Sequence, residues 1–358
     1  MCSLEQAKAA LDTIIKKSRV HLYKPIQIAE ILYKHRVDTS NSVVLKDLET
    51  YRKESKHWRD IICMQFLGRV STSSAKYQDN VFDANAIPPK ILSVLGQENK
   101  KHNGVVEAYI YQAFENKHKQ LNEALKYVLN SSTDSFELQV FLDQFWVQPG
   151  LKRSIDKIFE IVVYSLFEVL TLAIGVNIDI YYDISSKAIL EEFSEFAKKV
   201  LNLTPDNDRK TLKASFHRVG VTNAADRGLD IYANFGSVVQ VKHLALNEGV
   251  AESVVTSITS DRIIIVCKNA EAEVIHSLLT QIGWQSRIQS IITVDELVLW
   301  YKKAFQGKHS HLFARSLLST LSTEIKNEFP SVGNDDFQNF KRTRGYDKLE
   351  SEFWFVNI

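Results

Sequence analysis

Cysteine is scarce in this chain of 358 residues, which contains only Cys2, Cys63 and Cys267. The three lie far apart in the sequence and are odd in number, which argues against a disulfide framework and against a zinc site. Cys267 ends the apolar run 263–267 and is expected to be a small core residue. This cysteine usage is typical of a reducing compartment, and we expect the protein to be cytoplasmic.

Long apolar runs are also missing. No run reaches the roughly 18 residues that a membrane span needs, and the best candidate, 158–174, is interrupted by Glu160 and Glu168. The N-terminus lacks a basic region followed by an apolar stretch, so we expect neither a signal peptide nor a membrane partner. A glycine-rich phosphate loop is absent as well, which argues against dependence on ATP.

Net charge is close to zero, at +1, so the whole chain carries no electrostatic signature of nucleic-acid binding. The distribution is less even, because residues 1–80 hold 14 Lys and Arg against 9 Asp and Glu. This local basic excess is compatible with a surface that faces phosphates, although solvated charged faces are common.

The apolar pattern changes near residue 150. Before it, apolar residues recur at helical spacing in several segments, and no strong strand is predicted. After it, the pattern predicts a long apolar helix, a strand at 176–182, a helix at 185–201 and a polar link at 202–209. We therefore expect an α+β protein with a mainly helical region at 1–150, a mixed β-sheet flanked by helices at 151–306, and a C-terminal extension at 307–358.

The remainder of the second region contains the strands of this sheet. Two strands, 229–233 and 238–244, flank Asn234-Phe235-Gly236, a three-residue hairpin loop with glycine at the position that needs a left-handed backbone. A helix at 250–258, a strand at 262–267, a helix at 272–282 and a strand at 288–293 are predicted to follow.

The predicted hairpin places polar side chains on one face. If Ala233 pairs with Ser237, Asp230 lies opposite Gln240, and Lys242 joins the same face because side chains alternate along a strand. A carboxylate, a carboxamide and an ammonium suit hydrolysis of a phosphodiester with Mg²⁺, whose preferred ligands are oxygens at about 2.1 Å. Asp230 and Gln240 would bind the metal, and Lys242 would orient or deprotonate water. The same spacing also suits a simple Asp–Lys salt bridge.

This segment resembles the PD-(D/E)XK nucleases in the form found in Mrr-like enzymes. The resemblance rests on Asp226-Arg227-Gly228-Leu229-Asp230, on Gln240-Val241-Lys242, and on the order of the elements that follow. The whole chain also resembles the HaeII-type restriction endonucleases, in its length, in segment 21–33 and in the nuclease-like core.

The resemblance implies a type II restriction endonuclease that cuts a short palindromic duplex with Mg²⁺, with a GCGC core in its site. Because Gln240 replaces the usual Glu, another carboxylate is expected to assist the metal. Glu160 in the first core helix is our choice, with Glu168 second, and Asp226 could instead cap the hairpin or hold a second metal.

Double-stranded DNA is thus the expected partner, and the helical region is expected to grip and read it. Candidate contacts are Lys76, Gln78 and Asn80 in a polar loop, and Arg342 and Arg344 in a basic patch. Segment 24–36 could form part of a helix-turn-helix, with Lys24, Gln27 and Arg36 among the side chains facing DNA. A palindromic target predicts a homodimer, and a restriction system predicts a separately encoded DNA methyltransferase.

Two alternatives stay open at this point. One is a modification-dependent or repair nuclease of the Mrr-like class, which would ignore unmodified DNA. The other is a DNA-binding protein that keeps the fold without turnover, which the glutamine at position 240 favours.

Overall fold

The computed structural model of the chain describes residues 2–148, 150–207, 209–219, 229–243, 245–258, 260, 262–270, 287–329 and 334–355. The described residues form two compact units. The first holds residues up to Ile158 together with those from Ser322 onward, and the second holds those from Phe159 to Leu321. The chain therefore leaves the first unit, builds the second, and returns.

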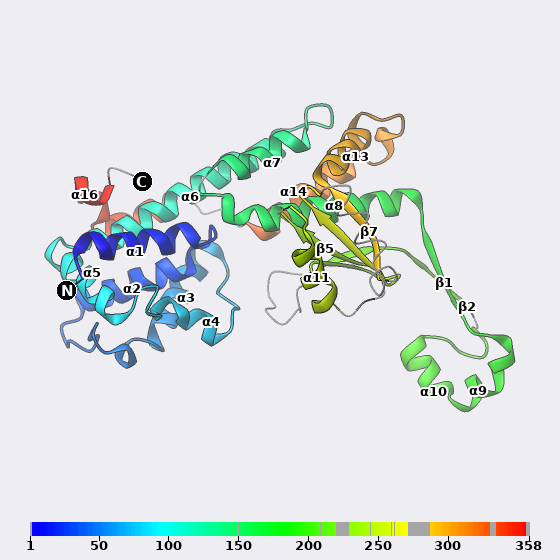
Figure 1. Cartoon of the computed structure of the whole chain (residues 1–358), viewed down its shortest axis with the longest axis horizontal. Coiled ribbons are helices and arrows are strands. Elements are labelled where there is room, and N and C mark those ends of the chain that lie inside the picture. The colour runs from blue at the N-terminus through cyan, green and yellow to red at the C-terminus, as the bar shows by residue number, and fades with distance from the viewer. Residues whose placement is uncertain are drawn as a thin grey trace. The chain divides into compact units, whose positions relative to one another are not determined.

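The first unit is helical. Two helices have residues in both units: α8 (Ile155–Ile174) begins in the first unit and continues in the second, and α14 (Ala314–Glu328) begins in the second and ends in the first. The other helices of this unit are α1 (Leu4–Lys17), α2 (Tyr23–Val37), α3 (Glu54–Leu67), α4 (Ala75–Asp79), α5 (Pro89–Lys101), α6 (Val105–Asn130), α7 (Leu138–Val147), α15 (Asn334–Thr343) and α16 (Glu352–Phe355) (Figure 1).

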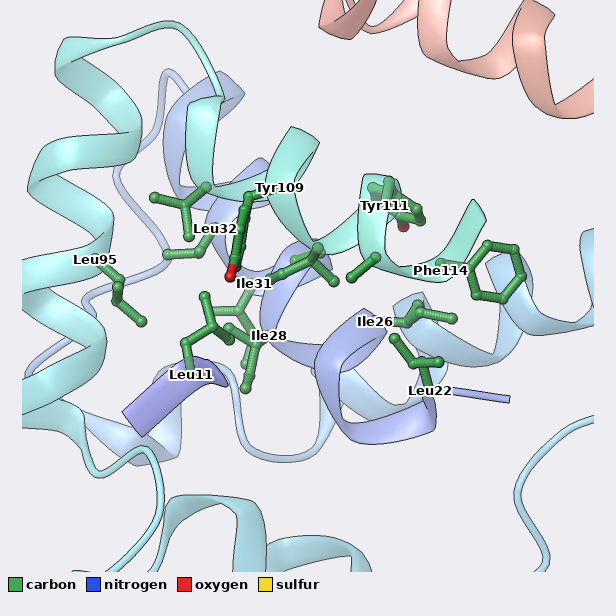
Figure 2. Close-up of a cluster of buried hydrophobic side chains, with 14 of the residues drawn as sticks. Leu11, Leu22, Ile26, Ile28, Ile31, Leu32, Leu95, Tyr109, Tyr111 and Phe114 are labelled. Atoms are coloured by element: carbon green, nitrogen blue, oxygen red, sulfur yellow. The ribbon is translucent and has the colours of Figure 1, made fainter. Parts of the chain in front are cut away.

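Local chemistry explains where these helices begin. In α1, the Gln6 backbone N–H donates to Ser3 Oγ and the Ser3 N–H donates to Gln6 Oε1, a reciprocal capping box that satisfies two amides at the helix end. Ala7, Leu11 and Ile15, spaced by four residues, form the buried stripe of α1. Figure 2 shows Leu11 beside the apolar residues of α2 and α6.

Helix α2 is the core helix of this unit. All of its residues from Pro25 to Leu32 are buried. The Gln27 side chain, expected to face DNA, instead donates to Ser55 Oγ at 2.9 Å and accepts from Arg59 at 3.2 Å. A helix covered on all sides cannot lie in a DNA groove, so the prediction that Gln27 faces DNA is wrong.

Two predicted helices, 105–118 and 122–129, form the single helix α6 (Val105–Asn130). The polar residues between them, Lys119 and Gln120, do not interrupt it because both are good helix formers. The predicted polar loop 71–80 contains the short helix α4, for which Ser74 Oγ accepts the Tyr77 backbone N–H.

Buried ionic groups join the C-terminal segment to this unit. Arg344 binds Glu30 of α2 through two parallel hydrogen bonds of 2.6 and 3.0 Å. The Tyr346 hydroxyl donates to Glu107 at 2.6 Å, and Glu107 also receives two bonds from Arg36. Buried ion pairs of this kind stabilise the fold only when each charged group has a partner.

Two buried histidines of the first unit predict sensitivity to mild acid. Burial, the largest cause, lowers the pKa of His21 to about 3 and that of His118 to about 4. In the unfolded chain the pKa of a histidine is about 6.5. Above that pH both histidines are neutral in the folded and in the unfolded protein, but below it only the unfolded chain takes up the protons. We expect the free energy of unfolding to fall by about 2 to 3 kcal/mol between pH 7.5 and pH 5.5, since each histidine contributes up to about 1.4 kcal/mol per pH unit.

Urea unfolding followed by circular dichroism at the two pH values measures this. A His118→Gln variant should lose roughly half of the pH dependence, whereas His57→Gln, at an exposed position, should keep all of it. Equal stability at both pH values would contradict the assignment.

The second unit is built on a five-stranded mixed sheet in the order β3-β4-β5-β6-β7. Strands β3 to β5 are antiparallel, and β5 to β7 are parallel. The bounds are β3 (Phe216–Arg218), β4 (Ile231–Ala233), β5 (Val238–Lys242), β6 (Ile263–Cys267) and β7 (Ile288–Thr293). Strand β6 is buried throughout, as expected for a parallel strand covered on both faces.

Helices flank this sheet. Helix α11 (Glu248–Ser257) contributes Ala251 and Val254 to a core with Ile263 and Ile265 of β6. Helix α8 contacts β3, where the rings of Phe167 and Phe216 lie 5.4 Å apart. Helix α13 (Val294–Gln306) follows β7 directly. The prediction of an α+β chain, with a helical N-terminal region and a mixed sheet flanked by helices, is confirmed. The predicted helix 272–282 lies outside the described residues.

A separate two-stranded sheet interrupts the second unit. Strand β1 (Asn177–Tyr181) was predicted, but it pairs antiparallel with β2 (Arg209–Lys213), part of a segment in which no strand was expected. The predicted single helix 185–201 is divided into α9 (Lys187–Glu192), α10 (Ser194–Phe196) and a π-helical turn (Ala197–Leu201). Figure 1 shows β1 and β2 running side by side between the end of α8 and these short helices.

None of the helices in the described part of the chain has both the length and the apolar character needed to cross a membrane.

Candidate active site

The hairpin between β4 and β5 has the predicted geometry. The Ala233 N–H donates to the Ser237 carbonyl at 2.7 Å, and Gly236 adopts a φ of 96° in the left-handed region. The ladder pairs Ile231 with Val239, which sets Asp230 opposite Gln240. The register inferred from loop length and strand alternation is therefore confirmed.

Strands β4 and β5 diverge beyond this point. Their ladder ends at Ile231, whereas β5 continues beside β6 as far as Lys242. The Asp230 carbonyl accepts the Val219 N–H at 2.9 Å, so the Asp230 backbone stays with the β3 side of the sheet. A fork between two strands leaves backbone groups of β5 in need of other partners.

The Asp230 side chain occupies this fork. Its Oδ2 accepts the Val241 backbone N–H at 2.8 Å and also a hydrogen bond from Gln240 Nε2. A carboxylate that accepts from a backbone amide and from a carboxamide is held in one orientation. The sheet thus fixes both the position and the orientation of this charged oxygen.

Gln240 and Lys242 share one face of β5, while Val239 and Val241 are buried on the other. Gln240 is 3% exposed, and both Lys242 and Asp230 are partly buried. The structure therefore brings Asp230 and Gln240 into contact and places Lys242 one side-chain position further along the same strand face. A carboxylate, a carboxamide and an ammonium thus form a polar centre at the end of β4 and β5.

The predicted fourth residue lies on α8. Glu160 is 5% exposed among apolar neighbours, and helical spacing places it on the same side of α8 as Glu168, two turns away. The Glu168 carboxylate accepts the Phe216 backbone N–H at 2.6 Å, so it holds α8 against the edge strand β3. That contact gives Glu168 a structural role in the fold, and Glu160 stays the predicted additional acidic residue. Asp226 lies outside the described residues.

The donor set at the fork meets part of what Mg²⁺ needs. Among the described residues, no three His, Cys, Asp or Glu side chains gather closely enough to hold a metal ion. Mg²⁺ usually binds through only one or two carboxylates and fills its shell with waters and substrate phosphate oxygens. Asp230 and the carboxamide of Gln240 fit that limited requirement, provided that the amide rotates so that Oε1 replaces Nε2.

A second polar region lies in the first unit around α4. Arg52, Lys76, Tyr77 and Asn80 are among the residues lining a hollow of about 730 Å³. Lys76 and Tyr77 are exposed, and Lys24 lies over the Tyr77 ring at 4.0 Å from its centre. Lys24 also donates to Asn80 Oδ1.

Arg52, which lines this hollow, was not among the predicted contacts, whereas Lys24 was predicted to face DNA as part of segment 24–36. Gln78, which was predicted, is partly buried and donates to the Ser73 carbonyl. The basic excess of residues 1–80 was the sequence signal for this surface, but it could not indicate which cations lie together.

The two arginines of the predicted basic patch near the C-terminus lie in different environments. Arg342 is exposed. The Arg344 guanidinium is bound to Glu30 and stacks 3.8 Å above the Tyr33 ring. Because its donors face protein groups, Arg344 has a structural use and its geometry gives no support to a phosphate contact.

Comparison with known proteins decides the family. The model of the HaeII restriction endonuclease family matches residues 7–346. The chain belongs to the HaeII restriction endonuclease family. The type II restriction enzyme NgoBI of Neisseria gonorrhoeae is 54% identical over 350 residues, which cover 98% of this chain and 99% of that enzyme. The type II restriction enzyme HaeII of Haemophilus aegyptius is 53% identical over 348 residues, covering 97% and 98%.

No solved structure matches the chain. Membership in the HaeII family makes this protein an enzyme, a type II site-specific deoxyribonuclease, and confirms the resemblance of the whole chain to the HaeII-type restriction endonucleases. The family match includes both the fork at Asp230 and the hollow around α4. Within this family, the polar centre on β4 and β5 is the candidate for the hydrolytic site.

Proposed function

We propose that this restriction endonuclease hydrolyses duplex DNA at a short palindromic site, with Mg²⁺ as cofactor and with a PD-(D/E)XK-type centre formed by Asp230, Gln240 and Lys242. The observation that supports this most is the fork between β4 and β5. There the Asp230 carboxylate is fixed by Val241 and Gln240, next to a lysine on the same strand face.

The roles follow from the donor types. Asp230 and Gln240, with Glu160 as the additional carboxylate, would hold the metal, which lowers the pKa of bound water and stabilises charge on phosphorus when present. Lys242, as an ammonium, orients the attacking water and offsets negative charge on the pentavalent species, while the proton of that water passes to solvent. Water adds to phosphorus and the bond to the 3′ oxygen breaks, which leaves 5′-phosphate and 3′-hydroxyl ends.

Recognition is assigned to the helical first unit. The proposed DNA contacts are Lys76, Gln78 and Asn80 near the hollow, together with Arg342. Arg344 is not among them, because its guanidinium is bound to Glu30. Arginine and lysine reach phosphates, and carboxamides can read base edges. The sequence resemblance suggests a GCGC core in the site. The enzyme is proposed to act in the cytoplasm as a homodimer, beside a separately encoded methyltransferase.

Cleavage of unmethylated phage DNA tests the proposal. With Mg²⁺ the wild-type enzyme should give discrete fragments whose mapped ends share one palindromic sequence, and EDTA should abolish them. The same DNA methylated within that sequence should stay intact.

Other outcomes separate the alternatives. Cleavage of only methylated DNA would point to a modification-dependent nuclease. Binding without cleavage in Mg²⁺ and in Mn²⁺ would point to a protein without turnover, and the proposed mechanism would then be wrong.

A further inference from the structure

The β1–β2 hairpin and the short helices between its strands, residues 177–213, here called the arm, expose an unusual amount of apolar surface. About a third of the large hydrophobic side chains that are exposed among the described residues lie on the arm. On the arm these include Tyr181, Ile184, Ile189, Phe193, Phe196 and Val200, all more than half exposed. Surface of this kind marks an interaction site.

The arm has little core of its own. In its helical tip, residues 182–208, the buried apolar side chains of the described residues are Leu190, Ala197 and Leu203. The stem, β1 and β2, forms a two-stranded sheet separate from the main sheet, and an isolated pair of strands is marginally stable in water. Folding of this segment as described is therefore best explained by a partner that covers it.

Charge on the arm indicates what the partner is. The stem strands carry Asp179 against Arg209, Lys210 and Lys213, a net charge of +2. The tip carries six acidic residues against three lysines, a net charge of −3. The acidic tip repels a DNA backbone, and it complements the basic stem of an identical arm.

We propose that the arms of two copies of this chain clasp each other across a two-fold axis, the tip of one against the stem of the other. This arm exchange rests on the proposed function, because cutting both strands of a palindrome requires two symmetry-related active sites. A two-fold axis doubles every tip-to-stem contact, and the exposed aromatic residues of both tips are buried at the same interface.

Sedimentation velocity of the full-length enzyme, with and without a duplex, tests the apolar part. The wild type should be a dimer at micromolar concentration. Replacing both phenylalanines, Phe193→Asp with Phe196→Asp, should weaken dimerisation by about 100-fold or more, since buried aromatic residues dominate interface energies. Leu312→Asp is the matched control, because Leu312 is 67% exposed but lies outside the arm, and it should leave the dimer unchanged.

A charge exchange tests whether the partner is a second copy. Chains with an acidic stem (Lys210→Glu with Lys213→Glu) should fail to dimerise, and so should chains with a basic tip (Glu191→Lys with Glu192→Lys). A mixture of the two should form heterodimers, because each acidic stem then meets a basic tip. Loss of folding, or docking of the arm onto its own chain, cannot produce this rescue in a mixture.

The outcomes separate this inference from the proposed function. A wild type that cuts DNA but sediments as a monomer under both conditions overturns the arm exchange alone. A dimer unaffected by both sets of substitutions also overturns it. A dimer that depends on the arm but leaves DNA intact with Mg²⁺ supports the arm exchange and contradicts the nuclease mechanism.

Discussion

Replacing Lys242 with alanine is expected to lower kcat for DNA cleavage by roughly 10³-fold or more, because one positioned group that both orients the attacking water and stabilises developing charge contributes on the order of 10² to 10⁴. The substitution removes the ammonium at the end of β5 but leaves the strand paired with β6 through Cys267. Binding of DNA should change little, since most affinity comes from phosphate contacts elsewhere.

Single-turnover cleavage and filter binding of a short duplex, run side by side, measure the two effects separately. Lys302→Ala, which removes an exposed lysine of α13 in the same unit, is the matched control and should cleave at the wild-type rate. Asp230→Asn should be at least as damaging to cleavage as Lys242→Ala. Cleavage by Lys242→Ala within tenfold of the wild-type rate would remove Lys242 from the catalytic centre.

The second large effect concerns stability. Glu30→Gln should reduce the free energy of unfolding by about 3 to 5 kcal/mol, because it leaves the charge of Arg344 buried without its counter-ion. Glu30 is 2% exposed and also accepts a hydrogen bond from the Tyr111 hydroxyl, which glutamine can still accept. The loss should therefore combine the missing charge with the missing second acceptor for Arg344, since one carboxylate oxygen becomes an NH2 group.

Urea unfolding of paired variants isolates this contribution. Removing the guanidinium as well, in Glu30→Gln with Arg344→Met, should recover most of the stability, since no unpaired charge is left. Glu49→Gln provides the control, because its ion pair with Arg52 is exposed and should contribute less than about 1 kcal/mol. A Glu30→Gln protein as stable as the wild type would show that the pair contributes nothing.

The hairpin was predictable because its determinants are local. Gly236 fixes the loop, the alternation of apolar and polar residues fixes the two faces, and together they set Asp230 opposite Gln240. No distant partner is needed to define that register. The same reasoning explains why strand β7 was placed correctly, from its own apolar residues.

Elements that depend on distant partners were missed. Strand β2 reads Arg-Lys-Thr-Leu-Lys and has no apolar face, so only its pairing with β1 makes it a strand. Gln27 and Arg344 look like polar surface residues in the sequence. Their partners, Ser55 and Glu30, lie 28 and 314 positions away, and no local pattern reveals such contacts.

Because the chain returns to its first unit at its C-terminal end, the order of synthesis determines when each unit can finish folding. Trp354 and Phe337 belong to the same apolar core as Leu11 and Ile26, so that core is incomplete when Ile158 leaves the ribosome. At about 5 to 20 residues per second, the missing residues arrive roughly 10 to 40 s later. Over that interval the second unit can fold on the nascent chain, while the helices proposed to read DNA still lack their last packing partners. Completion of the first unit is therefore among the final events of synthesis, and the polar centre on β4 and β5 can be in place before the unit proposed to direct it to a site.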